Sequence, residues 1–514
     1  MATMISTNRA QDRLTWWRRY AILPVVILLS ACSAAGDSDQ APNTPLSTPM
    51  AFVANQNDAT LTTIRLDGSQ APVISTIPLG PPQSGAIGGV AFSLGEWVFA
   101  TNTETNKVAA IDPIGALQPI LEEFLEVNGP VRLGLRPTRI YRDALDKEVL
   151  LTMNEGDPVT GLDTIRGCPH GGSVTVLHNS HLSAGGEKPR VTTTVCLSGV
   201  GRHEVAFALP TATAPDRKEV AFVTSQTTGI ISPLLADPSN GEVRWSEFAP
   251  SVIDLCDSTE EQSKGFPACD VSPTTPNHAA PIGIYWSQAT GKLYSYLSGY
   301  QSVVEIDPDA FPLVPGRRVE TGAFQSAAMT PNGRYLILFG VDLSSDPTKV
   351  MGKLGFIDLT KSTLTLAGGA LVDHAWPSQF RFTPDGTRLY LTLSNSTIGL
   401  TAQQADTVKN DKLMVFDTTT LPFPFRLLAE VDLPAVGPLG VHGLDVWVTG
   451  AKGVGSAKGI VVTNAPQGTD GSVSLIDAAT NQVTTTIPVG RNPKQVMVYY
   501  AGLAASDNQA TPTW

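Results

Sequence analysis

Four of the seven histidines lie just before or at the start of a short apolar segment. Imidazole nitrogens bind copper, zinc, iron and nickel, and a nearby carboxylate can accept the second ring N–H of such a ligand. Glu204, Asp373 and Asp445 stand beside or near three of these histidines. If the rings converge, they would form a divalent or transition metal site for a lactonase-like hydrolase or an oxidoreductase. The four candidates are His203, His278, His374 and His442.

A structural role is the alternative for the same histidines, since polar groups inside a protein are commonly satisfied by backbone and water alone. His170, in the sequence GCPHGG, and Arg491, in a turn near the C-terminus, are two further candidates for ligand binding. Arg491 would favour an anion, and a solvent-facing turn residue is its alternative. The sequence has no Gly-x-Ser-x-Gly elbow, phosphate-binding loop or dinucleotide fingerprint. Catalytic residues are therefore not identified.

The N-terminus predicts lipid attachment. Four arginines and the apolar run YAILPVVILLSA precede Cys32. A run of about a dozen residues is too short to span a bilayer and is typical of a signal peptide. The sequence LSAC matches a bacterial lipobox, so we expect residues 1–31 to be cleaved and Cys32 to carry the lipid. An uncleaved anchor is the alternative. Ser33 after the cysteine favours the outer membrane.

Four cysteines remain after Cys32, and an even number in an exported chain favours disulfide bonds. Three pairings are open. We favour Cys168–Cys196 and Cys256–Cys269, because each bond would close one irregular region. None of these cysteines fits a haem attachment motif or a paired Cys-x-x-Cys zinc site.

A sequence repeat, which forms the strands, must position all these residues. Residues 461–498 contain an apolar strand ending in Asn464, a strand ending in Ile-Asp, a third strand, and then a turn with Pro493 before a fourth. Weaker copies recur along the chain, with Pro-Asp-Gly and Pro-Asn-Gly turns between strands. Repeated units of four short strands are the signature of a β-propeller blade. The strand-ending asparagines are expected to bond their own turns.

We count eight copies of the repeat. Insertions obscure the register of the third and fourth copies, so a ring of seven blades is the alternative. The predicted fold is all-β, a single propeller. The chain enters with the second strand of a unit, AFVAN, and finishes with a first strand, KQVMVYY. We therefore expect the N- and C-terminal strands to pair within one blade and close the ring, which removes exposed edges.

The last copy resembles the YVTN-repeat β-propellers. Residues 461–464 (VVTN), 473–490 (VSLIDAATNQVTTTIPVG) and 490–498 (GRNPKQVMV) match the three elements of that repeat. The resemblance covers roughly residues 51–500 and is strong in the first two and last three copies. It implies the propeller architecture. It says little about activity, since propellers include binding proteins, lactonases, lyases and oxidoreductases.

The long insertions are expected on one face of the ring. Those at 156–172, 341–353 and 397–411 separate second from third strands, and the one at 256–281 precedes a first strand. In a propeller both kinds of connection emerge on the same side. Binding residues are often carried by loops on a rigid scaffold, so this face is the predicted binding surface.

Composition limits the partners. Residues 32–49 are small, polar and Pro-rich and are expected to form a disordered tether, followed by the propeller at 50–502 and a flexible tail at 503–514. Removing residues 1–31 takes away four positive charges and one negative, so the net charge changes from −12 to −15. An acidic body argues against nucleic acid. The membrane is then a partner through covalent lipid alone.

We therefore expect a monomeric, lipid-anchored propeller in the bacterial cell envelope, at the periplasmic or outer surface. Its loop-rich face would bind a protein, a glycan or a small ligand. The alternative function is a metal-dependent enzyme that uses the histidines at the mouth of the central channel.

Overall fold

The computed structural model describes residues 49–499 except for several internal segments, all of which belong to the compact unit Pro45–Trp514. The predicted signal peptide, Cys32 and the predicted C-terminal tail lie outside the described residues. The internal segments left out are 69–71, 82–86, 93–96, 114–119, 127–132, 144–148, 179–188, 213, 240–241, 257–278, 311, 343–347, 349, 368–370, 374–375, 398–399, 409–410, 420–425 and 449–455.

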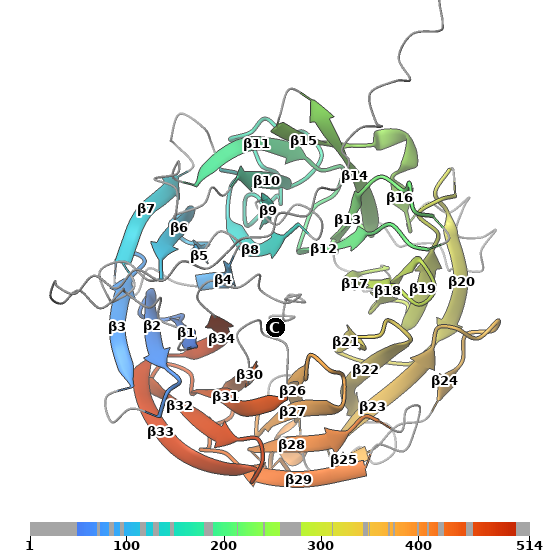
Figure 1. Cartoon of the computed structure of the whole chain (residues 1–514). Helices are drawn as coiled ribbons and strands as arrows, with labels where there is room; N and C mark the ends of the chain where they lie inside the picture. The colour runs from blue at the N-terminus through green and yellow to red at the C-terminus, as the bar shows by residue number, and fades with distance from the viewer. Residues whose placement is uncertain are drawn as a thin grey trace, which may run out of the picture. The chain divides into compact units, whose positions relative to one another are not determined.

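The described strands form eight antiparallel sheets, each with a path of four strands, arranged in a ring (Figure 1). The predicted β-propeller is confirmed, and eight sheets rather than seven are present. We number the blades 1 to 8 along the chain, with blade 1 at the two ends. The innermost strands are β34 (Pro493–Tyr499), β4 (Ile87–Phe92), β8 (Pro137–Arg142), β12 (His203–Ala208), β17 (Pro281–Ser287), β21 (Ser326–Met329), β26 (Trp376–Phe382) and β30 (Val441–Val448).

The remaining strands of each blade follow outward in chain order. The second strands are β1 (Met50–Asn55), β5 (Val98–Asn102), β9 (Val149–Asn154), β13 (Val220–Ser225), β18 (Lys292–Leu297), β22 (Tyr335–Asp342), β27 (Arg388–Ser394) and β31 (Ala457–Ala465). The third strands are β2 (Thr60–Arg65), β6 (Lys107–Asp112), β10 (Ser173–His178), β14 (Ile230–Ser239), β19 (Ser302–Ile306), β23 (Met351–Asp358), β28 (Lys412–Asp417) and β32 (Asp470–Asp477).

The outermost strands complete the blades. They are β3 (Val73–Pro78), β7 (Ile120–Glu126), β11 (Arg190–Cys196), β15 (Glu242–Glu247), β20 (Pro315–Glu320), β24 (Leu366–Ala367), β29 (Arg426–Asp432) and β33 (Gln482–Arg491). Two short strands, β16 (Ile253–Asp254) and β25 (Leu371–Asp373), pair with β14 and β23 in blades 4 and 6. Among the described residues, helical structure is limited to the 3-10 turn η3 (Ala249–Ser251) and the helix α2 (Ala402–Ala405). No helix in the described part of the chain has the length and apolar character needed to span a bilayer.

Blade 1 joins the two ends of the chain, as predicted. The second strand β1 pairs antiparallel with β34, from Met50 opposite Tyr499 to Asn55 opposite Pro493. Alternate residues of β1 pack in opposite directions. Phe52 and Ala54 belong to a hydrophobic cluster shared with blade 2, whereas Ala51 and Val53 pack with residues of blade 8. One strand therefore contributes to the packing on both sides of its blade.

The strand-ending polar residues of the repeat have defined structural roles. Asn55, Asn154 and Asn464 each donate from Nδ2 to two hydroxyl groups of the next strand at 2.8–3.0 Å. The predicted bond to the following turn is found at Asn102, which accepts from Thr105 N at 3.1 Å. The asparagines therefore fasten the second strand to the third inside a blade, and this role accounts for their recurrence without a metal ion.

An ion pair adds to the closure of the ring. Arg491 binds the Asp58 carboxylate through its guanidinium, and its backbone N–H donates to the same carboxylate at 2.7 Å. A Cβ at Gly490 would lie 2.6 Å from Asp58 Oδ2, so the close approach requires glycine. The contact explains Arg491 without a ligand, and the predicted role in anion binding would have to compete with this ion pair.

The substitution Asp58→Ala should weaken the closure. Loss of an acceptor shared by a guanidinium and a backbone N–H is expected to lower the free energy of unfolding by about 1–2 kcal/mol. Amide hydrogen exchange in β34 and β1 should accelerate. Asp358→Ala is the matched control, because Asp358 also accepts from an arginine and a backbone N–H, but within blade 6. Equal rates of amide hydrogen exchange in β34 in the two variants would contradict the role of Asp58 in closing the ring.

Candidate functional site

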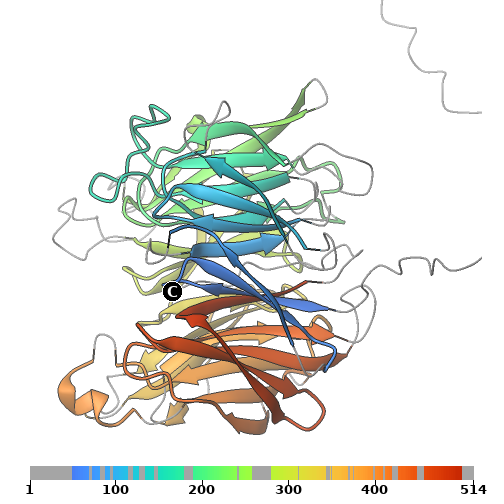
Figure 2. The ribbon, with the colours of Figure 1, turned by 90° about the vertical axis from the view of Figure 1, so that its left-hand side faces the viewer.

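The long connections gather on one side of the ring. The connection 155–172, which we call the blade 3 insertion, links β9 to β10, and the connection containing α2 links β27 to β28. Both join a second strand to a third strand and project on the left in Figure 2, as a teal loop and an orange helix. The innermost strands also begin on this side, because they follow the outermost strands. We call it the insertion side, and its position agrees with the predicted binding surface.

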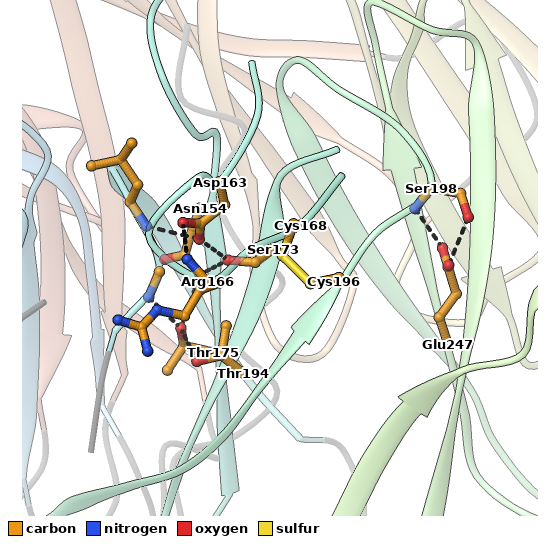
Figure 3. The surroundings of a disulfide bond; sticks show 12 residues. Asn154, Asp163, Arg166, Cys168, Ser173, Thr175, Thr194, Cys196, Ser198 and Glu247 are labelled. Atoms are coloured by element: carbon orange, nitrogen blue, oxygen red, sulfur yellow. Dashed lines mark hydrogen bonds between the residues drawn. A yellow bond between two sulfur atoms is a disulfide. The ribbon is translucent and has the colours of Figure 1, made fainter. Parts of the chain in front are cut away.

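A buried carboxylate holds the blade 3 insertion in place. Asp163 is fully buried, and its Oδ2 accepts from Leu135 N at 3.0 Å and from Ser173 Oγ at 2.6 Å. Its Oδ1 accepts from Arg166 N at 3.1 Å. Figure 3 shows these bonds beside Asn154. One side chain thus joins the insertion to the turn before β8 and to the start of β10.

A disulfide bond fixes the same insertion from its other end. Cys168 in the insertion is bonded to Cys196 at the end of β11 (Figure 3), which confirms this predicted pair. Just beyond it, Ser198 donates from its backbone N and its Oγ to Glu247 of blade 4 at 2.8 and 2.7 Å. Cys256 is also disulfide-bonded, and its predicted partner Cys269 lies outside the described residues.

The fixed insertion presents apolar side chains to solvent. Val159 is 91% exposed and Ile165 is 41% exposed. The disulfide bond and the buried carboxylate already order this loop. Binding through its exposed apolar side chains would therefore lose little conformational entropy. The predicted ligand residue His170 also lies in the insertion and is exposed.

A charged cluster lies next to this insertion on the innermost strands of blades 3 and 4. Glu204 on β12 is 8% exposed and accepts hydrogen bonds from Tyr141 and from Arg202, the latter at 3.0 Å from Nη2. It also forms an ion pair with Arg139. Two guanidinium groups thus share one carboxylate.

The surroundings of the cluster set its charge. Burial lowers the pKa of Arg202 to about 10 and also lowers the pKa of Arg139. Burial raises the pKa of Tyr141 and of Tyr285 on β17. At neutral pH Arg202 therefore remains cationic and both tyrosines remain neutral. The Tyr285 hydroxyl donates to Ala327 O of blade 6 at 2.7 Å.

His203 forms the start of β12 and is fully buried. Its Nδ1 lies 3.0 Å from Thr224 O and 3.2 Å from Ser225 Oγ, so we assign the proton to Nδ1. Its Nε2 has no hydrogen-bond partner among the residues that the structure describes and faces Gly172 at the end of the insertion, where a Cβ would lie 2.5 Å away. The ring therefore fills a space between blades 3 and 4 that exists because residue 172 is glycine.

His442 has the equivalent place at the start of β30. Its Nδ1 faces Thr463 O and Asn464 Oδ1 at 3.2 and 3.1 Å. Its Nε2 lies 2.8 Å from the Asp411 carboxylate of blade 7. Like His203, this ring bonds the second strand of its own blade and faces the preceding blade.

The two described histidines of the predicted metal site belong to blades 4 and 8, half a turn apart in the ring. His278 and His374 lie outside the described residues, so the four-histidine site stays a prediction. Within the part of the chain that the structure describes, no group of three or more His, Cys, Asp or Glu side chains could hold a metal ion.

Sequence reasoning missed the most informative residues on the insertion side. Arg139, Arg202 and Lys494 lie in or directly before innermost strands, yet no motif marks them as ligand-binding residues. The signal available in the sequence was a charged residue inside a segment predicted to face the ring centre.

Comparison with known proteins supports the fold alone. No protein-family model matches the chain, and no curated protein sequence matches it. The structure of the dihydro-heme d1 dehydrogenase NirN in complex with DHE is similar, with 16% identity and a TM-score of 0.50 over 91% of this chain and 78% of that one. The periplasmic gluconolactonase PpgL of Pseudomonas aeruginosa has 12% identity and a TM-score of 0.48 over 88% of this chain and 99% of that one. Apo AztD from Citrobacter koseri has 14% identity and a TM-score of 0.47 over 89% of this chain and 99% of that one. Membership of the YVTN-repeat family stays a prediction.

The burial of His203 predicts a pH dependence of stability. Desolvation lowers its pKa in the folded protein from 6.5 to about 4, so the unfolded chain binds the proton more readily between these values. The free energy of unfolding should fall as the pH falls from 6.5 to 4, by on the order of 3 kcal/mol. Urea unfolding of the protein and of His203→Asn isolates this contribution. If the two pH profiles stay parallel, the ring is not held neutral by burial.

Proposed function

We propose that the protein is a ligand-binding β-propeller of the bacterial cell envelope, tethered by lipid on Cys32, whose ligand contacts the insertion side near the ring centre. One observation carries the proposal. The blade 3 insertion is fixed by a disulfide and by buried Asp163, and it stands beside the charged cluster around Glu204. Preorganised loops and a few convergent polar groups are typical of binding sites.

The described residues favour binding over catalysis. Glu204 is occupied by three donors, and the two described histidines bond groups of their own and neighbouring blades. A general base needs a side chain free to reach a substrate proton. The metal-dependent enzyme remains the second candidate, and it depends on His278 and His374.

The cellular location rests on the sequence. The arginine-rich start, the short apolar run and the lipobox ending at Cys32 support export and lipid attachment. A protein or glycan partner fits the exposed Val159 and Ile165 of the insertion, and a small ligand fits the charged cluster beside them. The net charge of −12 argues against nucleic acid as a partner.

Binding can be located by hydrogen exchange. The full-length protein in detergent micelles would be screened by thermal shift with sugars, amino acids and small carboxylic acids. Each compound that raises the unfolding temperature would then be mapped. Protection is expected in 155–172, around Arg202 and in the turn at Asn492. Protection confined to the opposite-side turns, such as that at Asp385, would refute the assignment of the binding face, and a screen without binders would refute the small-ligand proposal.

Lipid attachment has its own test. In a Gram-negative host, the protein should incorporate labelled palmitate and sediment with the membrane fraction. Cys32→Ala should abolish the label and leave the protein soluble or unprocessed. Ser33→Asp is the matched control, because it keeps the cysteine and should retain the label while moving the protein to the inner membrane. A labelled Cys32→Ala variant would contradict the proposal.

A further inference from the structure

The exposed apolar side chains of the insertion side have two candidate contacts in a lipid-anchored protein. Val159 and Ile165 of the blade 3 insertion are 91% and 41% exposed, and Leu439 before β30 is 49% exposed. Exposed apolar surface marks contact with a membrane or with another protein. The choice between them depends on which side of the ring faces the lipid, and the direction of the strands at the two chain ends decides it.

Both ends of the ring leave it on the side away from the insertions. Strand β1 begins at Met50, which lies opposite Tyr499 at the end of β34, and it ends at Asn55. The connection after Asn55 joins a second strand to a third, so this end of β1 is on the insertion side. Met50 and Tyr499 are therefore on the other side of the ring, which we call the tether side.

The predicted tether reaches the tether side directly. It runs from Cys32 to residue 49, and a flexible chain of this length has a typical end-to-end distance of about 20–25 Å. To bring the insertion side to the membrane, the tether would have to pass outward over two strands and then across the ring, which the six residues of β1 cross. That path is about 30 Å long. It exceeds the typical reach, so most conformations of the tether keep the insertion side away from the lipid.

The composition of the blade 3 insertion also argues against contact with lipid. Loops and helices that enter a membrane surface typically combine Trp, Phe or Leu with Lys or Arg. Residues 155–172 contain no Trp, Tyr, Phe or Lys, and their three acidic residues outnumber the single Arg166. Anionic lipids repel a surface of this kind. The exposed Val159 and Ile165 therefore fit an apolar pocket of a protein better than a bilayer.

We propose that the insertion side faces away from the membrane that holds Cys32, and that Val159 and Ile165 contact a water-soluble protein. These two side chains supply neither hydrogen bonds nor aromatic faces, so an apolar protein pocket matches them better than a glycan. The loop is already ordered by its disulfide bond and by Asp163, so docking loses little conformational entropy. The proposal rests on the proposed binding function and lipid attachment, and it specifies the class of partner.

Energy transfer to the membrane tests the orientation. A fluorophore would be attached, without reducing agent, to Leu439→Cys or Ala479→Cys in the full-length lipoprotein on phosphatidylethanolamine and phosphatidylglycerol vesicles that contain a headgroup-labelled acceptor lipid. The positions are a matched pair, because both are exposed in blade 8, Leu439 on the insertion side and Ala479 in the turn after β32 on the tether side. We expect about twofold or more efficient transfer from position 479, because the two sides lie roughly 20 Å apart.

Equal transfer from the two positions, or more transfer from position 439, would overturn the orientation. Cys32→Ala is the control without lipid and should show no transfer from either position. If the unaltered protein does not attach to the vesicles, the lipid tether and this orientation are both refuted, and the binding function stands.

Photo-crosslinking tests the class of partner. A benzophenone side chain at position 159 should link to a water-soluble protein in the native host, and the same group at position 479 should not. The linked protein, identified by mass spectrometry and purified, should bind the full-length propeller in micelles, and Val159→Asp should weaken that binding at least about tenfold. Ala402→Asp is the matched control, because Ala402 is exposed on α2 and the change adds the same charge to the insertion side. Its affinity should be unchanged.

Linkage from position 159 only to lipid or to membrane-embedded proteins would overturn the proposal, as would an affinity that Val159→Asp leaves unchanged. If no protein is linked but small compounds bind on the insertion side, the class of partner is refuted and the binding function stands. If neither proteins nor small compounds bind there, both are refuted.

Discussion

The antiparallel pairing of β1 with β34 is the constraint on which the rest of the structure depends. Every blade packs against two neighbours, so a ring of blades is complete only when its first and last members belong to one sheet. Here that sheet is built from both ends of the chain. Because β1 packs toward blade 2 and toward blade 8 with alternate residues, an unpaired β34 would expose apolar surface on both sides and leave a free strand edge. The Asp58–Arg491 contact holds this pairing at its insertion-side end.

The closed ring also fixes polar groups that are distant in the sequence. Thr103 of blade 2 donates to Pro137 O of blade 3 at 2.9 Å, and Asp445 of blade 8 accepts from Val498 N of blade 1 at 2.7 Å. His442 and Asp411 form a similar link between blades 8 and 7. Such contacts join consecutive blades through residues in or next to their two inner strands. A ligand that binds there meets groups already held in position, which favours affinity over conformational change.

The sequence predicted the strands well because a blade is a local structure. Each strand follows the previous one, so alternation, turn residues and the Asn and Asp positions can be found within a single copy. The eight copies counted in the sequence correspond to the eight blades. The histidines show the limit of the same method. Equivalent positions in a repeat are related by rotation about the ring axis, so they are spread around it, and His203 and His442 lie half a turn apart. Arg139, Arg202 and Lys494 were missed because they occupy different positions in different copies. Their common location becomes visible only when the ring is closed.

The uneven distribution of charged residues over the innermost strands of the eight blades is difficult to explain by folding alone. Blades 5 to 8 have the arrangement that stability favours, with Arg381 bound to Asp445. Blades 1 to 4 place two arginines on one glutamate. Proteins depart from these rules mainly at functional sites, and the blade 3 insertion, held by a disulfide bond and by Asp163, lies in this half of the ring. The fixed insertion and the charged cluster around Glu204 lie next to one another, and this is the arrangement that the proposed binding function requires.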